Sequence, residues 1–173
     1  MLRPGIEFIA SHPMAGREVS GVENSDDRIF RDANFIVTPT EKNTAEAIDW
    51  CRSLGRILGF RRISVLSPEK HDEMIGFLSQ LTHCIAVSLM TCNDSEHLAD
   101  YTGDSFRDLT RIARINENMW SELFILNKDV LLEQMDRFAD EFKEMRDMLS
   151  NNDAAGLRNK MRLSTRRRAV FDR

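Results

Sequence analysis

The 173-residue chain has few of the features that stabilise small secreted folds or place a protein in a membrane. Its three cysteines are an odd number and form no Cys-x-x-Cys pair, so we expect no disulfide framework, no metal site and a reducing, cytoplasmic compartment. No apolar run approaches the roughly 18 residues that cross a bilayer, and the first residues lack the apolar segment of a signal peptide, so we expect no membrane partner. No glycine trio follows a strand, so the chain shows no phosphate-binding loop.

The charge balance excludes one further class of partner. A net charge of −4 gives no broad basic surface for nucleic acid, and we expect none to bind. The basic run at 166–168 is a local exception, interpreted as the solvated end of a helix. A length of 173 residues suggests one domain, or one domain and part of another.

The first third of the sequence alternates short β-like runs with turn residues. Residues 6–10 and 34–39 are strand candidates, the second ended by its proline. Residues 44–58 have helical periodicity and are followed by Gly59 as a C-cap, and residues 60–66 are a third strand candidate. This strand–helix–strand unit predicts the last part of an α/β sheet and is too small to be a complete one.

From Ser67 onward the pattern becomes helical. Ser67 is a typical N-cap, and Pro68 suits the first helical position. Apolar periodicity then predicts helices over residues 68–91, 105–115, 117–127, 128–150 and 153–169. The predicted fold class is therefore mainly α, with the end of an α/β sheet followed by an all-helical part.

His12 is the strongest candidate for chemistry. It follows an apolar run, residues 8–10, and precedes a proline, as expected where a strand stops and presents a side chain at its carboxyl end. In open α/β sheets, ligands bind beyond the carboxyl ends of strands. A histidine placed there can accept or donate a proton near neutral pH. The alternative is a polar turn residue without chemistry.

The first long helix divides into two stripes. One is apolar and contains Met74, Leu78, Leu81, Ile85 and Leu89. The other contains small or polar residues, namely Asp72, Gly76, Ser79 and His83. The second stripe allows the close approach of another backbone or lines a cavity, so His83 is either a core histidine or a ligand-binding one.

Three arginines share one face of the next predicted helix, namely Arg107, Arg111 and Arg114. Like charges at this spacing repel, so they need an anion nearby. Either Asp104 and Asp108 supply it, or an arginine binds a carboxylate of a ligand through a bidentate fork. Trp120, further along, is either a core residue or a surface on which a ring stacks.

Four segments together resemble the prephenate dehydrogenase family, which includes arogenate-using relatives. They are SHPMAGRE at 11–18, PEKHD at 68–72 leading to His83, FRDLTRIA at 106–113 and NENMWSELFILNK at 116–128. The resemblance implies a Rossmann domain followed by a helical dimerisation domain, here residues 1–67 and 68–173, and a homodimer. It also implies that most of the NAD or NADP site, including the GxGxxG turn, lies outside this chain.

The implied reaction is the NAD(P)-dependent oxidative decarboxylation of prephenate to 4-hydroxyphenylpyruvate, in tyrosine biosynthesis. By resemblance, His12 accepts the proton of the ring hydroxyl, and Arg111 binds a substrate carboxylate. The other implied substrate-binding residues are Gly16, Arg17, Glu18, His83, Asp108 and Trp120, the last coming from the neighbouring subunit. Gln80 departs from the pattern, since some relatives have a second histidine there.

Two alternatives stay open from the sequence. The first is an arogenate dehydrogenase, which differs in the side chain of its substrate. The second is a non-catalytic helical module that dimerises and binds a ligand, which the missing nucleotide turn favours. We expect residues 1–173 alone to be inactive, because no pyrophosphate-binding turn is present.

Overall fold

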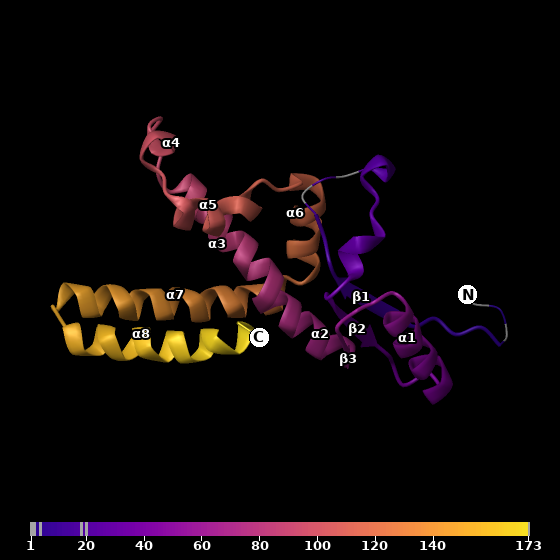
Figure 1. Ribbon diagram of the computed structural model, residues 1–173. Helices are drawn as coiled ribbons and strands as arrows, with labels where there is room; N and C mark the ends of the chain where they lie inside the picture. The colour runs from indigo at the N-terminus through magenta and orange to yellow at the C-terminus, as the bar shows by residue number, and fades with distance from the viewer. Residues whose placement is uncertain (1–2, 4, 18, 20, 173) are drawn as a thin grey trace. The chain divides into compact units, whose positions relative to one another are not determined.

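A three-stranded sheet forms the first part of the fold in the computed structural model, which describes residues 3, 5–17, 19 and 21–172. The strands are β1 (Ala10–Met14), β2 (Asn34–Thr38) and β3 (Arg62–Val65), in the order β1-β2-β3. β2 and β3 are parallel and are joined through helix α1 (Ala45–Ile57), as Figure 1 shows. β1 runs antiparallel to β2 and places His12 opposite Ile36.

The core of this part lies between the sheet and α1. Phe35, Val37, Cys51 and Phe60 are buried together, and the rings of Phe35 and Phe60 stack with their centroids 4.8 Å apart. Gly55 lets α1 approach the sheet, because a Cβ there would lie 2.8 Å from the ring of Phe35. The predicted strand–helix–strand unit is therefore present.

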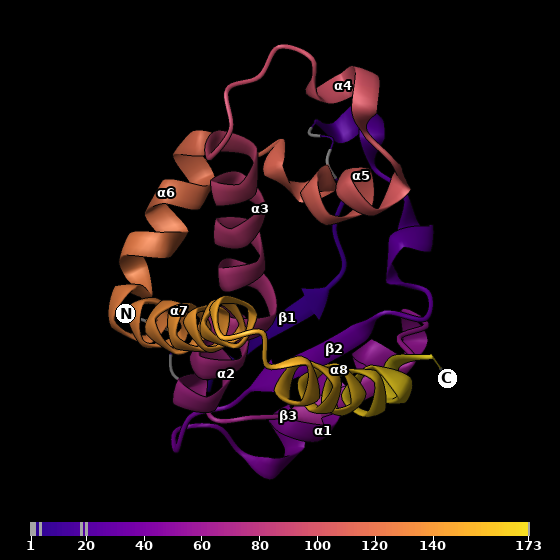
Figure 2. The same ribbon diagram turned by 90° about the vertical axis from the view of Figure 1, so that its left-hand side faces the viewer.

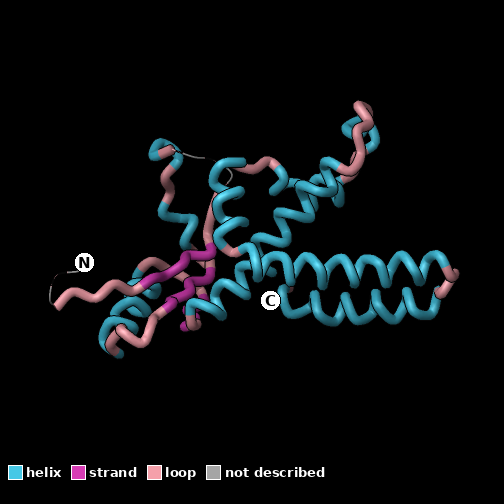
Figure 3. The backbone as a smooth tube through the Cα atoms, turned by 180° about the vertical axis from the view of Figure 1, so that it is seen from behind, coloured by secondary structure: helices cyan, strands magenta, loops and turns pink. Residues whose placement is uncertain are grey.

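The helical part begins with one continuous helix of 24 residues, Pro68–Thr91. It consists of α2 (Pro68–Ile75), a π turn (Gly76–Gln80) and α3 (Leu81–Thr91), and the Ser67 side chain caps its start. The remaining helices appear in Figures 2 and 3: α4 (Leu98–Tyr101), α5 (Asp104–Thr110), α6 (Glu117–Leu126), α7 (Lys128–Ser150) and α8 (Ala154–Arg168). Short 3-10 turns occupy Val22–Asn24, Asp27–Phe30, Arg111–Ala113 and Ala169–Phe171.

The chain divides into two compact units, Met1–Leu131 and Leu132–Arg173. In the second unit, α8 and most of α7 form a helical hairpin (Figure 1). Lys160 of α8 bridges Glu141 and Glu144 of α7, and the Asp153 side chain caps the start of α8. One face of α7 carries exposed apolar side chains at alternating spacings of three and four residues, namely Met135, Phe138, Phe142, Met145 and Leu149.

Two expectations about local structure were wrong. His12 does not follow a strand but is the central residue of β1, which starts where the apolar run of residues 8–10 ends. Because β1 is antiparallel to β2, its carboxyl end also points away from the carboxyl ends of β2 and β3. His12 therefore does not lie at a ligand-binding strand end, although its side chain is half-buried.

The apolar stripe of the first long helix also differs from the expectation. Leu78 is 52% exposed, while Gly76, Gln80, Leu81 and Ala86 are buried. Gly76 and Leu78 both lie within the π turn, whose wider repeat turns their side chains away from the directions of a regular α-helix, while Leu81 directly after it is buried as predicted. A constant helical repeat across residues 68–91 is thus the assumption that failed.

The same helix is long and apolar enough, by length and composition, to cross a bilayer. Only 22% of an apolar stretch of 18 residues in this helix is buried within this chain. Scattered polar residues interrupt the apolar runs of this segment, so its length as an apolar helix is not evident from the sequence. Much of the helix thus has an apolar surface that one copy of the chain leaves uncovered.

Candidate active site

Two histidines and an aspartate form a hydrogen-bonded chain between the sheet and the first long helix. His12 Nδ1 lies 2.9 Å from His71 Nε2, and His71 Nδ1 lies 2.8 Å from Asp72 Oδ1. His71 is fixed by the start of α2, where its backbone N–H donates to the Ser67 carbonyl over 2.9 Å. The cap at Ser67 therefore also sets the position of His71 relative to β1.

The surroundings of His12 favour its neutral form. Burial lowers the pKa of His12, and the neighbouring His71 ring lowers it further. A neutral imidazole has a lone pair that can accept a proton, as a general base requires. His71 was not predicted as a site residue, although the PEKHD segment that contains it was part of the resemblance.

A groove of about 550 Å³ lies beside His71, at the carboxyl ends of β2 and β3. This is the edge at which parallel sheets bind ligands. The charged side chains that line it are Glu7, Lys42 and Asp72, and its other lining residues are Ile6, Phe8, Ala10, Thr38, Thr40, Asn43, Pro68 and His71.

His83 and Trp120 form a second cluster. Their rings stack with centroids 3.7 Å apart and planes inclined by 29°, and His83 Nδ1 donates to the Ser79 carbonyl over 2.8 Å. Trp120 also contacts the Phe124 ring. Within this chain Trp120 stacks on His83, and its role in the site of a neighbouring subunit, implied by the resemblance, stays a prediction.

Gln80 is buried and joins the π turn to α6. Its amide donates to the Leu123 carbonyl over 3.1 Å, and its oxygen accepts from Asn127 Nδ2 over 2.8 Å. Asn127 Nδ2 also donates to the Asp72 carbonyl over 3.0 Å. The departure from the family pattern at Gln80 is thus a structural hydrogen-bonding position in this chain.

The expected carboxylate-binding helix is α5 with the 3-10 turn that follows it. Arg111 opens that turn and is exposed, as is Asp108 on α5. Arg107 pairs with Asp104 over 3.2 Å. For this arginine, an aspartate of the same helix supplies the anion, which was one of the two alternatives from the sequence.

The loop after β1 holds the remaining predicted residues. Gly16 is exposed with open space around its Cβ position. Arg17 donates to the Asn24 carbonyl over 3.3 Å and lies 3.8 Å from Asp26, so its own loop holds it. Glu18 lies outside the described residues.

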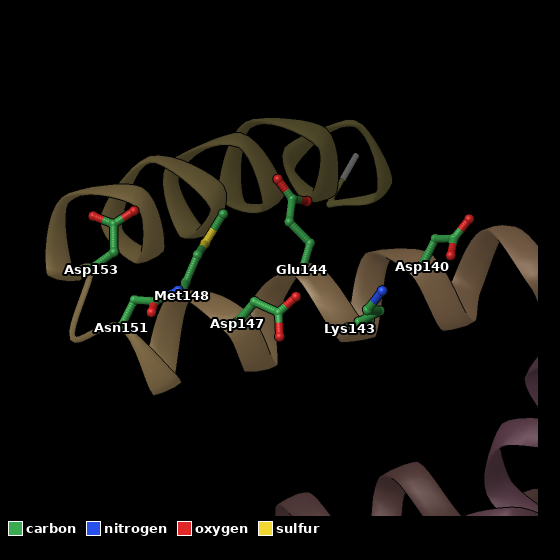
Figure 4. Close-up of a pocket in the computed structure, with 7 residues that line it drawn as sticks. All are labelled: Asp140, Lys143, Glu144, Asp147, Met148, Asn151 and Asp153. Carbon is green, nitrogen blue, oxygen red and sulfur yellow. The ribbon is translucent and has the colours of Figure 1, made fainter.

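An acidic groove of about 420 Å³ lies on the α7–α8 hairpin (Figure 4). Its carboxylates do not converge, since Asp140 and Asp153 lie at opposite ends of the group and Glu144 pairs with Lys160. Within the described part of the chain, no three His, Cys, Asp or Glu side chains could together hold a metal ion.

Comparison with known proteins identifies relatives along nearly the whole chain. Residues 1–63 match the family model "prephenate dehydrogenase, nucleotide-binding domain", and residues 67–163 match "prephenate dehydrogenase, dimerization domain". The chain is 31% identical over 156 residues to the prephenate dehydrogenase of Bacillus subtilis, and this match covers 87% of this chain and 42% of that protein. It is 30% identical over 156 residues to the cyclohexadienyl dehydrogenase of Zymomonas mobilis, covering 87% and 53%.

Solved structures match as well. The prephenate dehydrogenase of Aquifex aeolicus, crystallised with hydroxyphenyl propionate and NAD⁺, superposes with a TM-score of 0.86 at 27% identity, covering 96% of this chain and 60% of that one. The Synechocystis arogenate dehydrogenase has a TM-score of 0.81 at 22% identity, which shows a shared fold. The chain thus spans about half the length of the curated relatives it matches.

Proposed function

Because residues 67–163 match its dimerization-domain model, the chain belongs to the prephenate dehydrogenase family, and we propose that it carries the catalytic base and substrate site of such an enzyme. The proposed reaction is the oxidative decarboxylation of prephenate to 4-hydroxyphenylpyruvate, a step of tyrosine biosynthesis in the cytoplasm. The observation that carries the proposal is His12, half-buried with a lowered pKa and hydrogen-bonded to the helix that opens the helical part.

In this proposal, His12 hydrogen-bonds the ring hydroxyl and takes its proton as the C–H hydride leaves. The hydroxyl carbon becomes a carbonyl carbon, and CO₂ departs from the opposite ring carbon. The electron pair of the broken C–C bond moves through the ring to the carbonyl oxygen, which takes back a proton, so that the product is an aromatic phenol. A nicotinamide nucleotide, when bound, accepts the hydride. The protein holds the ring and the base in reacting geometry and provides cations for the carboxylates.

Arg111 is the proposed carboxylate-binding residue, because a guanidinium can hold a carboxylate by two parallel hydrogen bonds. His83 and Trp120 offer stacked rings for the cyclohexadiene. Gly16, Arg17, Glu18 and Asp108 complete the proposed substrate-binding set.

This chain contains only some of the elements expected to bind the nucleotide. The parallel pair β2–β3 with α1 between them resembles part of a nucleotide-binding sheet, and the matching family model carries that description. The turn before α1 is not glycine-rich, so no residue of this chain is assigned to the pyrophosphate of NAD or NADP. We propose domains at 1–67 and 68–173, a division supported by the two family models, which meet between residues 63 and 67.

A homodimer is part of the proposal. The dimerization-domain match, the exposed apolar stripe of α7 and the uncovered apolar surface of Pro68–Thr91 support it. Sedimentation at micromolar concentration is expected to give a dimer. Phe142→Glu should shift it toward monomer, while Asp136→Ala, on an exposed polar position of the same helix, should not. A monomeric wild type would contradict the proposal.

Arogenate is the second candidate substrate, favoured by the relative named probable arogenate/prephenate dehydrogenase, which is 24% identical over 166 residues. Calorimetric titration of residues 1–173 with prephenate and with arogenate tests both candidates. Arg111→Ala should weaken binding about 10- to 100-fold, the loss expected for a charge-assisted hydrogen-bonded pair. Arg114→Ala, three residues away, is the matched control.

An assay of NAD⁺ and NADP⁺ reduction completes the test. We expect no turnover by residues 1–173 alone, and turnover would contradict that expectation. Binding of neither ring substrate would favour the non-catalytic helical module instead.

A further inference from the structure

The contact between His12 and His71 joins two nitrogens, so one of them must carry the hydrogen. An imidazole nitrogen is either a donor or an acceptor, and the 2.9 Å separation fits a hydrogen bond in which one ring donates and the other accepts. Either ring could be the donor at this separation, because each imidazole has two tautomers. The third member of the chain, Asp72, decides which ring donates.

Asp72 fixes the protonation of His71. An ionised carboxylate only accepts hydrogen bonds, so the hydrogen in the 2.8 Å contact lies on His71 Nδ1. A neutral His71 that is protonated at Nδ1 has a lone pair at Nε2. His71 Nε2 then accepts, and the hydrogen it receives belongs to His12 Nδ1.

We propose that His71 and Asp72 are a positioning pair that keeps neutral His12 protonated at Nδ1 and leaves Nε2 as its proton-accepting nitrogen. The inference rests on the proposed role of His12 as the base. Nε2 of His12 is then the atom that takes the proton, and His71 and Asp72 are the residues that position it. A free neutral imidazole favours the opposite form, with hydrogen at Nε2, so the protein must impose this tautomer.

The local structure suits such a role. The His71 side chain is 19% exposed, which limits competition from water for its two hydrogen bonds. The backbone N–H of His71 is tied to Ser67, and the Asp72 carbonyl accepts from Asn127, so both ends of this turn are held. When His12 takes a proton at Nε2, its Nδ1–H keeps the bond to His71, whose own Nδ1–H remains on the carboxylate.

The charge of His71 sets the condition for this arrangement. A doubly protonated His71 would donate from Nε2, and a neutral His12 would then carry its hydrogen at Nε2, where it cannot act as a base. The other charged groups lining the groove beside His71 are Glu7 and Lys42. The tautomer is therefore measured at about pH 8.5, where an ordinary histidine is neutral.

Long-range ¹H–¹⁵N correlation spectra of the ligand-free chain test the proposal, since the chain has only four histidines. We expect a protonated Nδ1 and an unprotonated Nε2 for His12. His71→Phe should return His12 to the Nε2–H form, whereas His71→Gln should preserve the Nδ1–H form, because an amide oxygen can accept in place of the ring nitrogen. Asp72→Asn should weaken the preference.

The control is His97→Phe, which removes an exposed histidine that pairs with Asp100 and should leave the His12 signals unchanged. A Nε2–H tautomer for wild-type His12, or one that His71→Phe does not alter in a folded protein, would overturn the proposal. Titration of the same sample with prephenate and arogenate tests the proposed function separately. Absence of ring-ligand binding beside an intact Nδ1–H tautomer would count against that function and in favour of the hydrogen-bond assignment.

Discussion

Replacing the buried Gln80 tests whether the π turn and α6 are held together by polar contacts. Gln80 is 4% exposed, and its amide makes one hydrogen bond as donor and one as acceptor. Gln80→Leu keeps a similar volume but removes both bonds. Stability should therefore fall through lost hydrogen bonding rather than through a cavity.

The magnitude follows from what each partner retains. The Leu123 carbonyl still accepts from the Asn127 backbone N–H over 3.3 Å, and Asn127 Nδ2 still donates to the Asp72 carbonyl. Neither partner is left without a bond, so each loss should cost about 0.5–1.5 kcal/mol, the usual net value. The expected decrease in the free energy of unfolding is about 1–3 kcal/mol.

Urea denaturation followed by circular dichroism measures this change. Ser88→Ala, on an exposed position of α3, is the control and should lie within about 0.5 kcal/mol of the wild type. A Gln80→Leu protein as stable as this control would refute the reasoning. A double-mutant cycle with Asn127→Ala would then show whether the 2.8 Å bond contributes at all.

Three further predictions concern other contacts. Gly55→Ala should lower stability by about 1–3 kcal/mol in thermal denaturation, since its Cβ would lie 2.8 Å from a core ring carbon, and an unchanged Tm would contradict the packing. Hydrogen bonds from the N-cap of α1 lower the pKa of Glu7 below its usual 4.5. The ionised Glu7 therefore stabilises the folded state above that value, and this contribution is lost as pH falls through the lower folded pKa. Glu7→Gln should flatten that part of the acid-unfolding curve, and an unaltered curve would argue against the bonds. Alanine substitutions of His83 and Trp120 should show a coupling energy of about 0.5–1.5 kcal/mol, whereas additive effects would mean that the stacked rings do not interact.

Much of the secondary structure followed from local signals. The periodicity of residues 44–58, the glycine after them and the N-cap at Ser67 predicted helix boundaries within a residue or two. These signals work because capping and positive φ depend on residues that are adjacent in sequence. β2 and β3 were also predicted within one or two residues, whereas the first strand was displaced because its pairing with β2 decides where it begins.

The residues of the candidate site were also predicted from the sequence only in part. His12, Arg111, His83 and Trp120 were found from residue type and motif order, and the structure adds the stacking of the last two within one chain. His71 was missed as a partner of His12 because the two are 59 residues apart, and only the meeting of β1 with α2 brings them together. The shift in helical phase after Gly76 was missed because a π turn leaves no mark in composition.

The sequence by itself determined the family and the helical character and pointed to His12 as the proposed base, because these depend on residue types in a fixed order. The tertiary structure decided what surrounds His12. It placed His12 in the middle of an antiparallel strand, hydrogen-bonded it to His71 and Asp72, and buried Gln80 against α6. Hydrogen-bond partners and burial depend on which segments fold together, and a pattern along one segment does not record them.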